Sequence, residues 1–303
     1  MGRSLPLTPL RYLARGLHMW RLLQRTDPRT LIVITAPVFA PLVGWLWCAL
    51  HRRQLVVDCH PGVLHFRRWR WALPIHRRLF RHARLVLVHT PDDERLVNSW
   101  GAPALFLPDD LALQSQALPM PRHTTTPSIV VAGTFDPDEP ISALLAAAAL
   151  VPDMELRLTG DPERLPAALR SSAPKNVTFL GYLAYDRFLG EMLAADAVAV
   201  FTTDPHVMSR AGQDAIGLGR PLVSSDRPWL RSRFAETAVL CENEPEAIAR
   251  ALQEALRQQV SLAQRSRERA LTLRAWRDHG LEQLKLAVSP LSLPSRRGVL
   301  RTV

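Results

Sequence analysis

Polar residues and glycines follow a series of short apolar segments in this sequence, and such positions carry the chemistry of parallel α/β proteins. Residues 54–58 are mostly apolar until Asp58, and His60 comes two residues later. Asp58 and His60 have two possible interpretations. They have a catalytic or acceptor-binding role, or they are ordinary residues at the end of a strand. Five later apolar segments lead to loops that contain Gly, Ser, Thr, Asp or Pro, at residues 133–140, 160–164, 181–186, 202–212 and 224–229. Ligands of parallel sheets bind beyond the carboxyl ends of the strands, at helix N-termini, so these loops are where a ligand is expected.

Several other kinds of site lack their sequence signatures. The chain has no GxGxxG dinucleotide fingerprint, no GxSxG nucleophile elbow, no Walker A sequence and no His-x-x-x-His metal spacing. Its three cysteines, Cys48, Cys59 and Cys241, lie far apart in the sequence. This spacing excludes a disulfide scaffold and a cysteine-based zinc site.

The elements that position the later loops alternate regularly after residue 127. A length of 303 residues with a hydrophobic fraction of 47% allows two folded domains. Short buried strands are expected at 128–133, 154–159, 177–180, 197–201, 222–224 and 238–241. Helices are expected between them, at 141–150, 165–172, 186–194, 208–217 and 245–258. This alternation predicts a parallel, doubly wound sheet with helices on both faces.

Residues 31–50 are the ambiguous part of the N-terminal third. They contain no charge, their length is close to that of a membrane-spanning helix, and a His-Arg-Arg sequence follows them. However, Pro37 and Pro41 interrupt the segment, and a β-branched run precedes them. We favour a strand, a proline-marked turn, a helix and a second strand at 54–58 over a membrane span. A third strand at 84–89 and a short helix at 92–100 are expected to follow.

Positive charge is concentrated in the first third of the chain. The net charge is +10, and residues 1–110 carry nine of these charges because they contain 16 arginines and no lysine against 7 acidic residues. Residues 11–25 have the pattern of a basic amphipathic helix, and residues 64–82 combine arginine with tryptophan and phenylalanine. Each segment is either a solvated surface helix or a helix on an anionic membrane. The second segment also has a composition that stacks on single-stranded nucleic acid, but no nucleic-acid-binding signature accompanies it.

Composition also indicates the domain organisation. A stretch of proline, threonine and polar residues without periodicity interrupts the pattern and is typical of a linker. The expected parts are an N-terminal domain at 1–110, a linker at 111–127, a C-terminal domain at 128–260, a helix at 261–287 and a disordered basic tail at 288–303.

Five strings in the C-terminal part resemble the donor domain of family-4 glycosyltransferases. They are AGTFDPDEP (132–140), LTGDPERLP (158–166), NVTFLGYL (176–183), ADAVAVFTT (195–203) and AGQDAIGLGRPLVSSD (211–226). Two earlier strings, VVDCHPG (56–62) and VLVHTPDDERLV (86–97), more loosely resemble the acceptor domain. The resemblance implies the GT-B fold, an α/β architecture of two Rossmann-like parallel-sheet domains that face a cleft. The N-terminal domain would be incomplete, because the family's first strand and glycine-rich loop have no counterpart in this sequence. The helix at 261–287 would cross back to it, as the family's last helices do.

The resemblance implies transfer of a sugar from a nucleotide sugar to a lipid-linked or cell-envelope polysaccharide acceptor, with retention and without a metal or cofactor. The catalytic residues would be Asp58, His60 and His206. The donor-binding residues would be Gly133, Thr134, Phe135, Gly160, Tyr182, Leu183, Ser209, Arg210, Gly212 and Asp214. Among these, residues 133–135 and 209–212 would lie near the diphosphate, residues 182–183 would frame the base, and Asp214 would bind the ribose. The enzyme would be cytoplasmic and peripheral at the inner face of an anionic membrane, through its Arg/Trp-rich N-terminal third and without a nucleic-acid partner.

The sequence departs from the family pattern at the donor site. The first glutamate of the family's E-x7-E motif is replaced by His206, and the second is shortened to Asp214. Residues 136–139 contain three acids where the family has a basic pair, which leaves Arg210 to supply positive charge, unless Arg210 is an ordinary solvated helix residue. These departures favour an alternative function, a non-catalytic GT-B homologue that acts as a partner or glycan-binding subunit.

Overall fold

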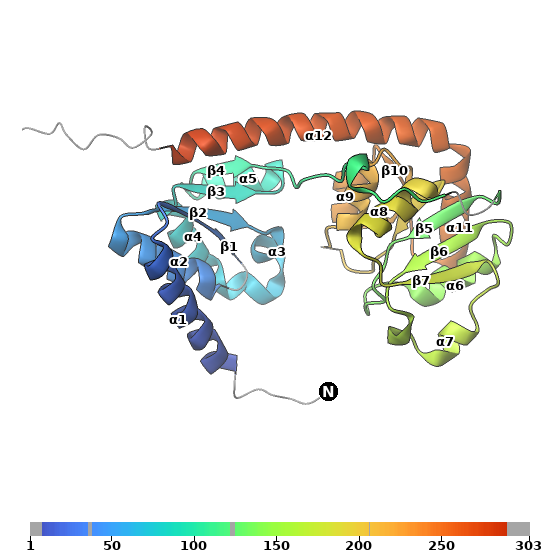
Figure 1. Cartoon of the computed structure of the whole chain (residues 1–303), viewed down its shortest axis with the longest axis horizontal. Coiled ribbons are helices and arrows are strands. Elements are labelled where there is room, and N and C mark those ends of the chain that lie inside the picture. The colour runs from blue at the N-terminus through green and yellow to red at the C-terminus, as the bar shows by residue number, and fades with distance from the viewer. Residues whose placement is uncertain (1–7, 36–37, 122–124, 206, 290–303) are drawn as a thin grey trace, which may run out of the picture. The chain divides into compact units, whose positions relative to one another are not determined.

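Two compact units make up the protein in a computed structural model that describes residues 8–35, 38–121, 125–205 and 207–289. The first unit contains the chain up to Asp109 together with the residues from Ala275 onward, and the second contains Asp110–Arg274. Figure 1 labels the helices and strands of both units.

The first unit is built on a four-stranded parallel sheet in the order β1-β2-β3-β4. The strands are β1 (Thr30–Ile34), β2 (Gln54–Cys59), β3 (Leu85–Val88) and β4 (Ala104–Phe106). The helices are α1 (Thr8–Thr26), α2 (Phe39–His51), α3 (Pro61–His65), the 3₁₀ helix η1 (Arg67–Ala72), α4 (Leu73–His82) and α5 (Pro91–Ser99). The C-terminal part of α12 (Gln259–Val288) also belongs to this unit.

Helices pack on both faces of this sheet because its strands are apolar on both sides. Val57 belongs to a buried cluster with Trp47 of α2 and Phe80 of α4. Its neighbour Val56 points to the opposite face, where Leu281 of α12 packs. Strand β2 is therefore a near-continuous apolar run, which is typical of a parallel sheet covered on both faces.

The second unit contains a six-stranded parallel sheet in the order β10-β9-β8-β5-β6-β7. The strands are β5 (Ser128–Val131), β6 (Glu155–Thr159), β7 (Val177–Gly181), β8 (Ala197–Val200), β9 (Leu222–Ser225) and β10 (Ala238–Cys241). The helices are α6 (Ile141–Ala149), α7 (Ala167–Ser171), α8 (Tyr185–Ala194), α9 (Arg210–Gly217), α10 (Pro228–Phe234), α11 (Pro245–Arg257) and the first part of α12, with the 3₁₀ helices η2 (Gln114–Gln116) and η3 (Pro162–Arg164). Ile129 and Leu252 pack on one face of the sheet, and Val130 and Leu189 on the other.

The strand order of the second sheet reverses between β5 and β8. From β5 the chain adds β6 and β7 on one side, and then β8, β9 and β10 on the other. Because β5 and β8 are parallel neighbours, the loops that follow them leave from adjacent strand ends. A reversal of this kind opens a crevice beyond the carboxyl ends of the strands, where doubly wound proteins bind their ligands.

The structure confirms the favoured interpretation of residues 31–58, since β1, α2 and β2 occupy them. Among the described residues, no helix combines the length and apolar character needed to cross a membrane. The segment 64–82 is not one helix: the chain is extended at Phe66 (φ −71°, ψ 127°), and Pro74 lies in the first turn of α4. Strand β4 has no counterpart among the sequence-based expectations.

The segment expected as a linker packs against the second unit over its first part. Leu111 and Ala112 are buried in that unit's core, and the Leu118 N–H donates to the carbonyl of Asp186 at the start of α8. The tail is expected at 288–303, but Val288 still belongs to α12, and residues from 290 onward lie outside the described residues.

Candidate functional site

The loops after β5 and β8 are hydrogen-bonded to one another at the reversal of strand order. The Thr202 hydroxyl donates to the Asp138 carboxylate at 2.7 Å. The Thr203 N–H donates to the carbonyl of Asp138 at 2.6 Å. The sequence-predicted donor loops are therefore brought together at one edge of the second sheet.

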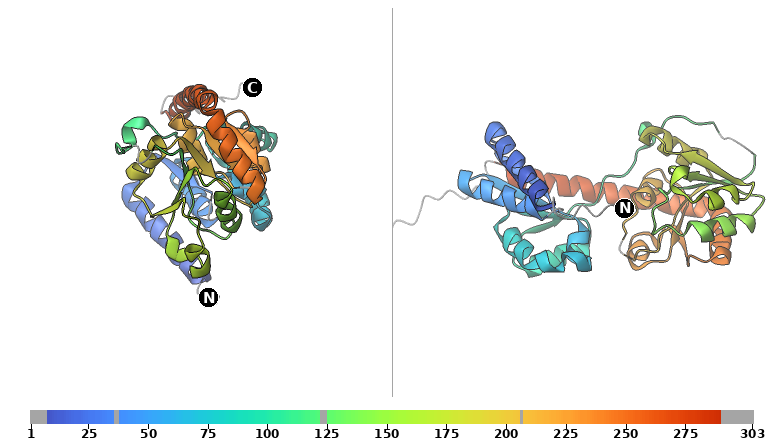
Figure 2. Two further views of the ribbon diagram at one scale, coloured as in Figure 1. Left: turned by 90° about the vertical axis from the view of Figure 1, so that its right-hand side faces the viewer. Right: turned by 90° about the horizontal axis from the view of Figure 1, so that it is seen from below.

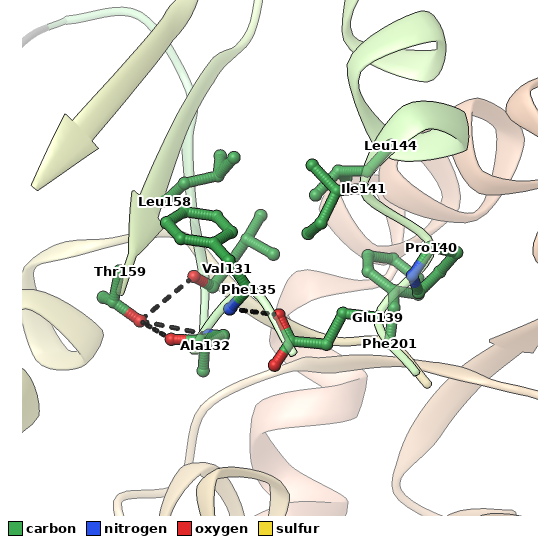
Figure 3. Close-up of a pocket in the computed structure, with 11 residues that line it drawn as sticks. Val131, Ala132, Phe135, Glu139, Pro140, Ile141, Leu144, Leu158, Thr159 and Phe201 are labelled. Atoms are coloured by element: carbon green, nitrogen blue, oxygen red, sulfur yellow. Dashed lines mark hydrogen bonds between the residues drawn. The ribbon is translucent and has the colours of Figure 1, made fainter. Parts of the chain in front are cut away.

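The loop at Gly133, Thr134 and Phe135 encloses a carboxylate of its own chain. Glu139 accepts hydrogen bonds from the backbone N–H groups of Thr134 and Phe135, each at 2.9 Å. Figure 3 shows the Glu139 carboxylate pointing at the Phe135 nitrogen. The Thr159 hydroxyl accepts the Gly133 N–H at 3.1 Å, so all three N–H groups of the expected phosphate loop have partners within the chain.

Gly160 supports this loop from the neighbouring strand. Its φ of +109° is in the region that favours glycine. A Cβ at this position would lie 2.9 Å from the Gly133 carbonyl oxygen and 3.1 Å from the Phe135 ring. Glycine is therefore required for close packing between the β5 and β6 loops.

Arg164 of η3 brings positive charge to the same loop. Its guanidinium donates to the carbonyl of Thr134 at 2.6 Å and to the carboxylate of Asp136 at 2.5 Å. Hydrogen bonds from Thr134 and Arg164 lower the pKa of Asp136. The resemblance to the family did not assign Arg164 to this loop, and Arg210 was the only residue expected to supply positive charge.

The N-terminus of α9 is capped by its own side chain. The Ser209 hydroxyl accepts the Gly212 N–H at 3.0 Å. Gly212 is buried, and a Cβ there would lie 2.9 Å from the Phe234 ring. The cap consumes one of the N–H groups that the resemblance assigns to the phosphates.

Asp214 lies beneath Arg210 and is fully buried. Arg210 Nε lies 3.1 Å from Asp214 Oδ1, and Arg210 Nη2 lies 3.3 Å from the Tyr185 hydroxyl. Burial raises the pKa of Asp214 against the opposing effect of Arg210. In this arrangement Asp214 holds Arg210, while a contact between Asp214 and a ribose stays a prediction that requires Arg210 to move.

The remaining predicted donor residues follow β7. Tyr182 is 86% exposed and Leu183 is half-buried, at the carboxyl end of a strand two positions from β5. His206 lies outside the described residues.

A second polar cluster lies at the carboxyl ends of β2 and β3 in the first unit. His89 Nε2 lies 2.8 Å from Asp58 Oδ1, and His89 Nδ1 lies 2.9 Å from Asp109 Oδ1. Burial by itself would lower the pKa of His89, but hydrogen bonds and attraction from Asp109 and Asp58 outweigh it and raise the pKa to about 9. The imidazole is therefore a cation between two carboxylates at neutral pH.

His60 completes this cluster at the surface. Its exposed ring is 5.2 Å from the His89 ring, and its backbone N–H donates to the Thr35 hydroxyl. Asp58, His60 and His89 also form a group whose ligand atoms lie within 4.8 Å of one another, as a metal site requires. The protonated state of His89 opposes metal binding, because an imidazole nitrogen must lose its proton to bind a metal.

The sequence did not identify His89, Arg164, Tyr185 or Glu139 as site residues. His89 carried one usable signal, because it ends the strand next to the one that ends at Asp58. Glu139 and Tyr185 carried no such signal. Glu139 contacts backbone N–H groups and Tyr185 contacts Arg210, and only the fold brings these partners together.

Residues 126–258 match the family described as glycosyl transferases group 1. These residues are similar to a glycosyl transferase domain. The matched residues span the whole six-stranded sheet, including both loops at the reversal. No protein with curated annotation matches the chain significantly.

The likeness to solved structures extends over most of the chain and is not limited to residues 126–258. Sucrose-phosphate synthase from Thermosynechococcus elongatus has a TM-score of 0.70 and 20% identity, over 94% of this chain and 79% of that one. HepE from Anabaena, in complex with UDP and glucose, has a TM-score of 0.65 and 16% identity, over 94% and 84%. OtsA has a TM-score of 0.67 and 12% identity, over 90% and 77%. These structures confirm the GT-B fold, and the family match of residues 126–258 supports the assignment to the glycosyltransferases.

Proposed function

We propose that this glycosyltransferase takes its sugar from a nucleotide sugar bound at the reversal of the second sheet. The observation that carries the proposal is the meeting of the β5 and β8 loops at that reversal, inside the residues that match the family. HepE, which shares the fold, is described in complex with UDP and glucose, and this supports a nucleotide sugar as the donor.

The described residues have distinct proposed roles at the donor. Arg210 is 54% exposed at its side chain and is held by Asp214, so its guanidinium is placed to neutralise the diphosphate. The Tyr182 side chain is exposed, and its proposed role is to stack its ring on the base. The resemblance to family-4 glycosyltransferases is the support for a transfer that retains the configuration of the sugar and needs no metal.

The acceptor is proposed to bind at the Asp58 cluster. Asp58 accepts a hydrogen bond from His89 through one carboxylate oxygen and is partly exposed, so its proposed role is to bind an acceptor hydroxyl. His60 lies exposed beside it. The proposed acceptor is a lipid-linked or cell-envelope polysaccharide, because the same unit has an apolar and basic surface that suits a membrane.

Helices α1 and α2 of this unit form an exposed apolar groove. The α1–α2 groove has a volume of about 360 Å³ and is lined by Tyr12, Leu13, Gly16, Leu17, Trp20, Phe39 and Val43. The two helices lie side by side (Figures 1 and 2), and the Tyr12 and Phe39 rings are 5.1 Å apart. Neither helix contains an acidic residue, and α1 carries four arginines. An apolar groove on a helix with four exposed arginines is complementary to an anionic lipid surface, so we propose peripheral binding there, at the cytoplasmic face of a membrane.

Calorimetric titration with UDP, GDP, ADP and TDP tests the proposed donor. We expect one of them to bind, and Arg210→Ala to weaken binding at least tenfold, because a charge-assisted contact to phosphate is lost (about 1.5–3 kcal/mol). Arg187→Ala is the matched control, since Arg187 is an exposed arginine of the same unit. Binding that is equal in wild type and R210A would exclude the role of Arg210, and no binding by any nucleotide would count against the donor.

A non-catalytic homologue is the second candidate function. It is favoured by the buried position of Asp214 and by the Glu139 carboxylate inside the expected phosphate loop. Incubation of the purified protein with a donor sugar and membrane extract separates the candidates. Release of nucleotide that Asp214→Ala abolishes would sink the non-catalytic alternative.

A further inference from the structure

The loop after β5 has the form of an anion-binding nest. Two successive backbone N–H groups, those of Thr134 and Phe135, point at one carboxylate, and the Thr134 hydroxyl also lies 3.1 Å from Glu139 Oε1. Phe135 has a φ of +58°, the left-handed conformation that turns consecutive N–H groups toward a common point. A Cβ on Gly133 would lie 2.6 Å from Glu139 Oε2, so glycine at 133 gives the carboxylate its close approach.

This nest lies where a donor phosphate is proposed to bind. It follows β5, the strand at the reversal of sheet order, and its neighbour Asp138 is bonded to Thr202 of the β8 loop. Backbone N–H groups at such a position bind phosphate in doubly wound proteins. In this structure the anion in the nest is Glu139.

The other acids of the loop have partners other than the backbone N–H groups. Asp136 pairs with Arg164 and accepts the Thr134 hydroxyl at 2.6 Å, and Asp138 accepts the Thr202 hydroxyl. Glu139 is therefore the acid of the loop whose carboxylate takes the N–H groups of Thr134 and Phe135. Thr134 is exposed and Glu139 is half-buried, so the carboxylate has a path out of the nest.

We propose that Glu139 acts as an internal anion that competes with the donor's diphosphate for the Thr134 and Phe135 N–H groups and thereby sets donor affinity. A carboxylate and a phosphate repel each other at close range and cannot accept the same two N–H groups. The diphosphate enters only when Glu139 leaves. The presence of Glu139 in the nest does not depend on the proposed function. The identity of the competing ligand as a donor diphosphate rests on the proposed function.

Two variants of Glu139 test the competition. Glu139→Gln removes the charge and keeps the shape, and Glu139→Ala empties the nest. We expect inorganic pyrophosphate and UDP to bind at least tenfold more tightly to both variants than to wild type in calorimetric titrations. Glu163→Gln is the control, because Glu163 is an exposed acid of the next loop that pairs with Arg170, and we expect it to leave both affinities unchanged.

Hydrogen exchange provides a readout that needs no ligand. The Thr134 and Phe135 N–H groups should exchange faster in Glu139→Ala than in wild type or Glu163→Gln. Unchanged exchange, or pyrophosphate affinity that is equal in wild type and E139Q, overturns the inference. Tighter pyrophosphate binding by E139Q together with no nucleotide binding by any variant supports the internal anion and rejects the proposed donor.

Discussion

His89 links the stability of the first unit to pH through its two carboxylate neighbours. Its pKa in the folded chain is about 9, against an ordinary value of 6.5. Because the folded value is the higher one, the stabilisation is complete below pH 6.5 and is lost as the pH rises through 9. We expect the free energy of unfolding of wild type to fall by about 3 kcal/mol over this range relative to His89→Gln. Urea titrations at pH 6, 7.5, 9 and 10 measure this, with the exposed His82→Gln as control. Parallel pH curves for wild type and H89Q would contradict the prediction.

Single site residues differ in how visible they are in the sequence. Asp58 and His60 stand out because an acid and a histidine close an apolar strand. Glu139 reads in the sequence only as an acid in place of a base, since its contact with Thr134 depends on the turn at Phe135. The burial of Asp214 was equally hidden, because Tyr185, which contacts its partner Arg210, comes from a different helix.

At the scale of elements, α8 is fixed to the start of the second unit by a close approach at Gly190. A Cβ on Gly190 would lie 2.2 Å from the Leu118 carbonyl oxygen and 2.8 Å from Met120 Cγ. A backbone oxygen cannot rotate away, so Gly190→Ala forces the helix and the segment apart. We expect a loss of about 2 kcal/mol in the free energy of unfolding, although alanine is the better helix former.

Gly16→Ala in α1 is the matched control for Gly190→Ala. The new Cβ at Gly16 would meet Val43 at an ordinary 3.5 Å. This variant should keep or slightly raise stability, because only the gain in helix propensity remains. Urea titrations of both variants measure the difference, and equal stabilities of G190A and wild type would show that residues 118–120 do not pack against α8.

Most elements could be predicted because apolar strands and amphipathic helices have visible periods. The alternation after residue 127 predicted β5 to β10, and the prolines at 37 and 41 correctly favoured a strand and a helix over a membrane span. Strand β4 was missed because three residues are too few to show an alternating hydrophobic pattern. Its position is fixed by pairing with β3. The end of α3 depends on an extended Phe66 that no pattern reveals.

At the scale of the whole molecule, the charge is divided between parts of the chain with different roles. Residues 1–110 carry nine of the ten net positive charges, although the proposed diphosphate site lies in the second unit. The proposed donor loop has three acids, and Arg164 pairs with one of them, while Arg210 pairs with Asp214. The excess of arginine is therefore not explained by nucleotide binding, and an anionic surface outside the donor site accounts for it better.

Vesicle co-sedimentation tests this division of charge at the α1–α2 groove. We expect binding to vesicles with 30% phosphatidylglycerol, little binding to neutral phosphatidylcholine vesicles, and a decrease at high salt, because the arginines of α1 face the headgroups through a screened attraction. Leu13→Gln with Leu17→Gln should weaken binding about tenfold or more, since two leucine side chains no longer enter the acyl region (about 1.5–3 kcal/mol each).

Both leucines are more than half exposed, at 61% and 51%, so their replacement should leave the fold intact. Leu150→Gln with Leu271→Gln is the matched control, because these leucines are exposed to a similar degree in the second unit and should not affect vesicle binding. Equal binding to neutral and anionic vesicles would exclude the arginines as the source of attraction. An equal loss in both double variants would show that general surface hydrophobicity, and not the groove, holds the protein on lipid.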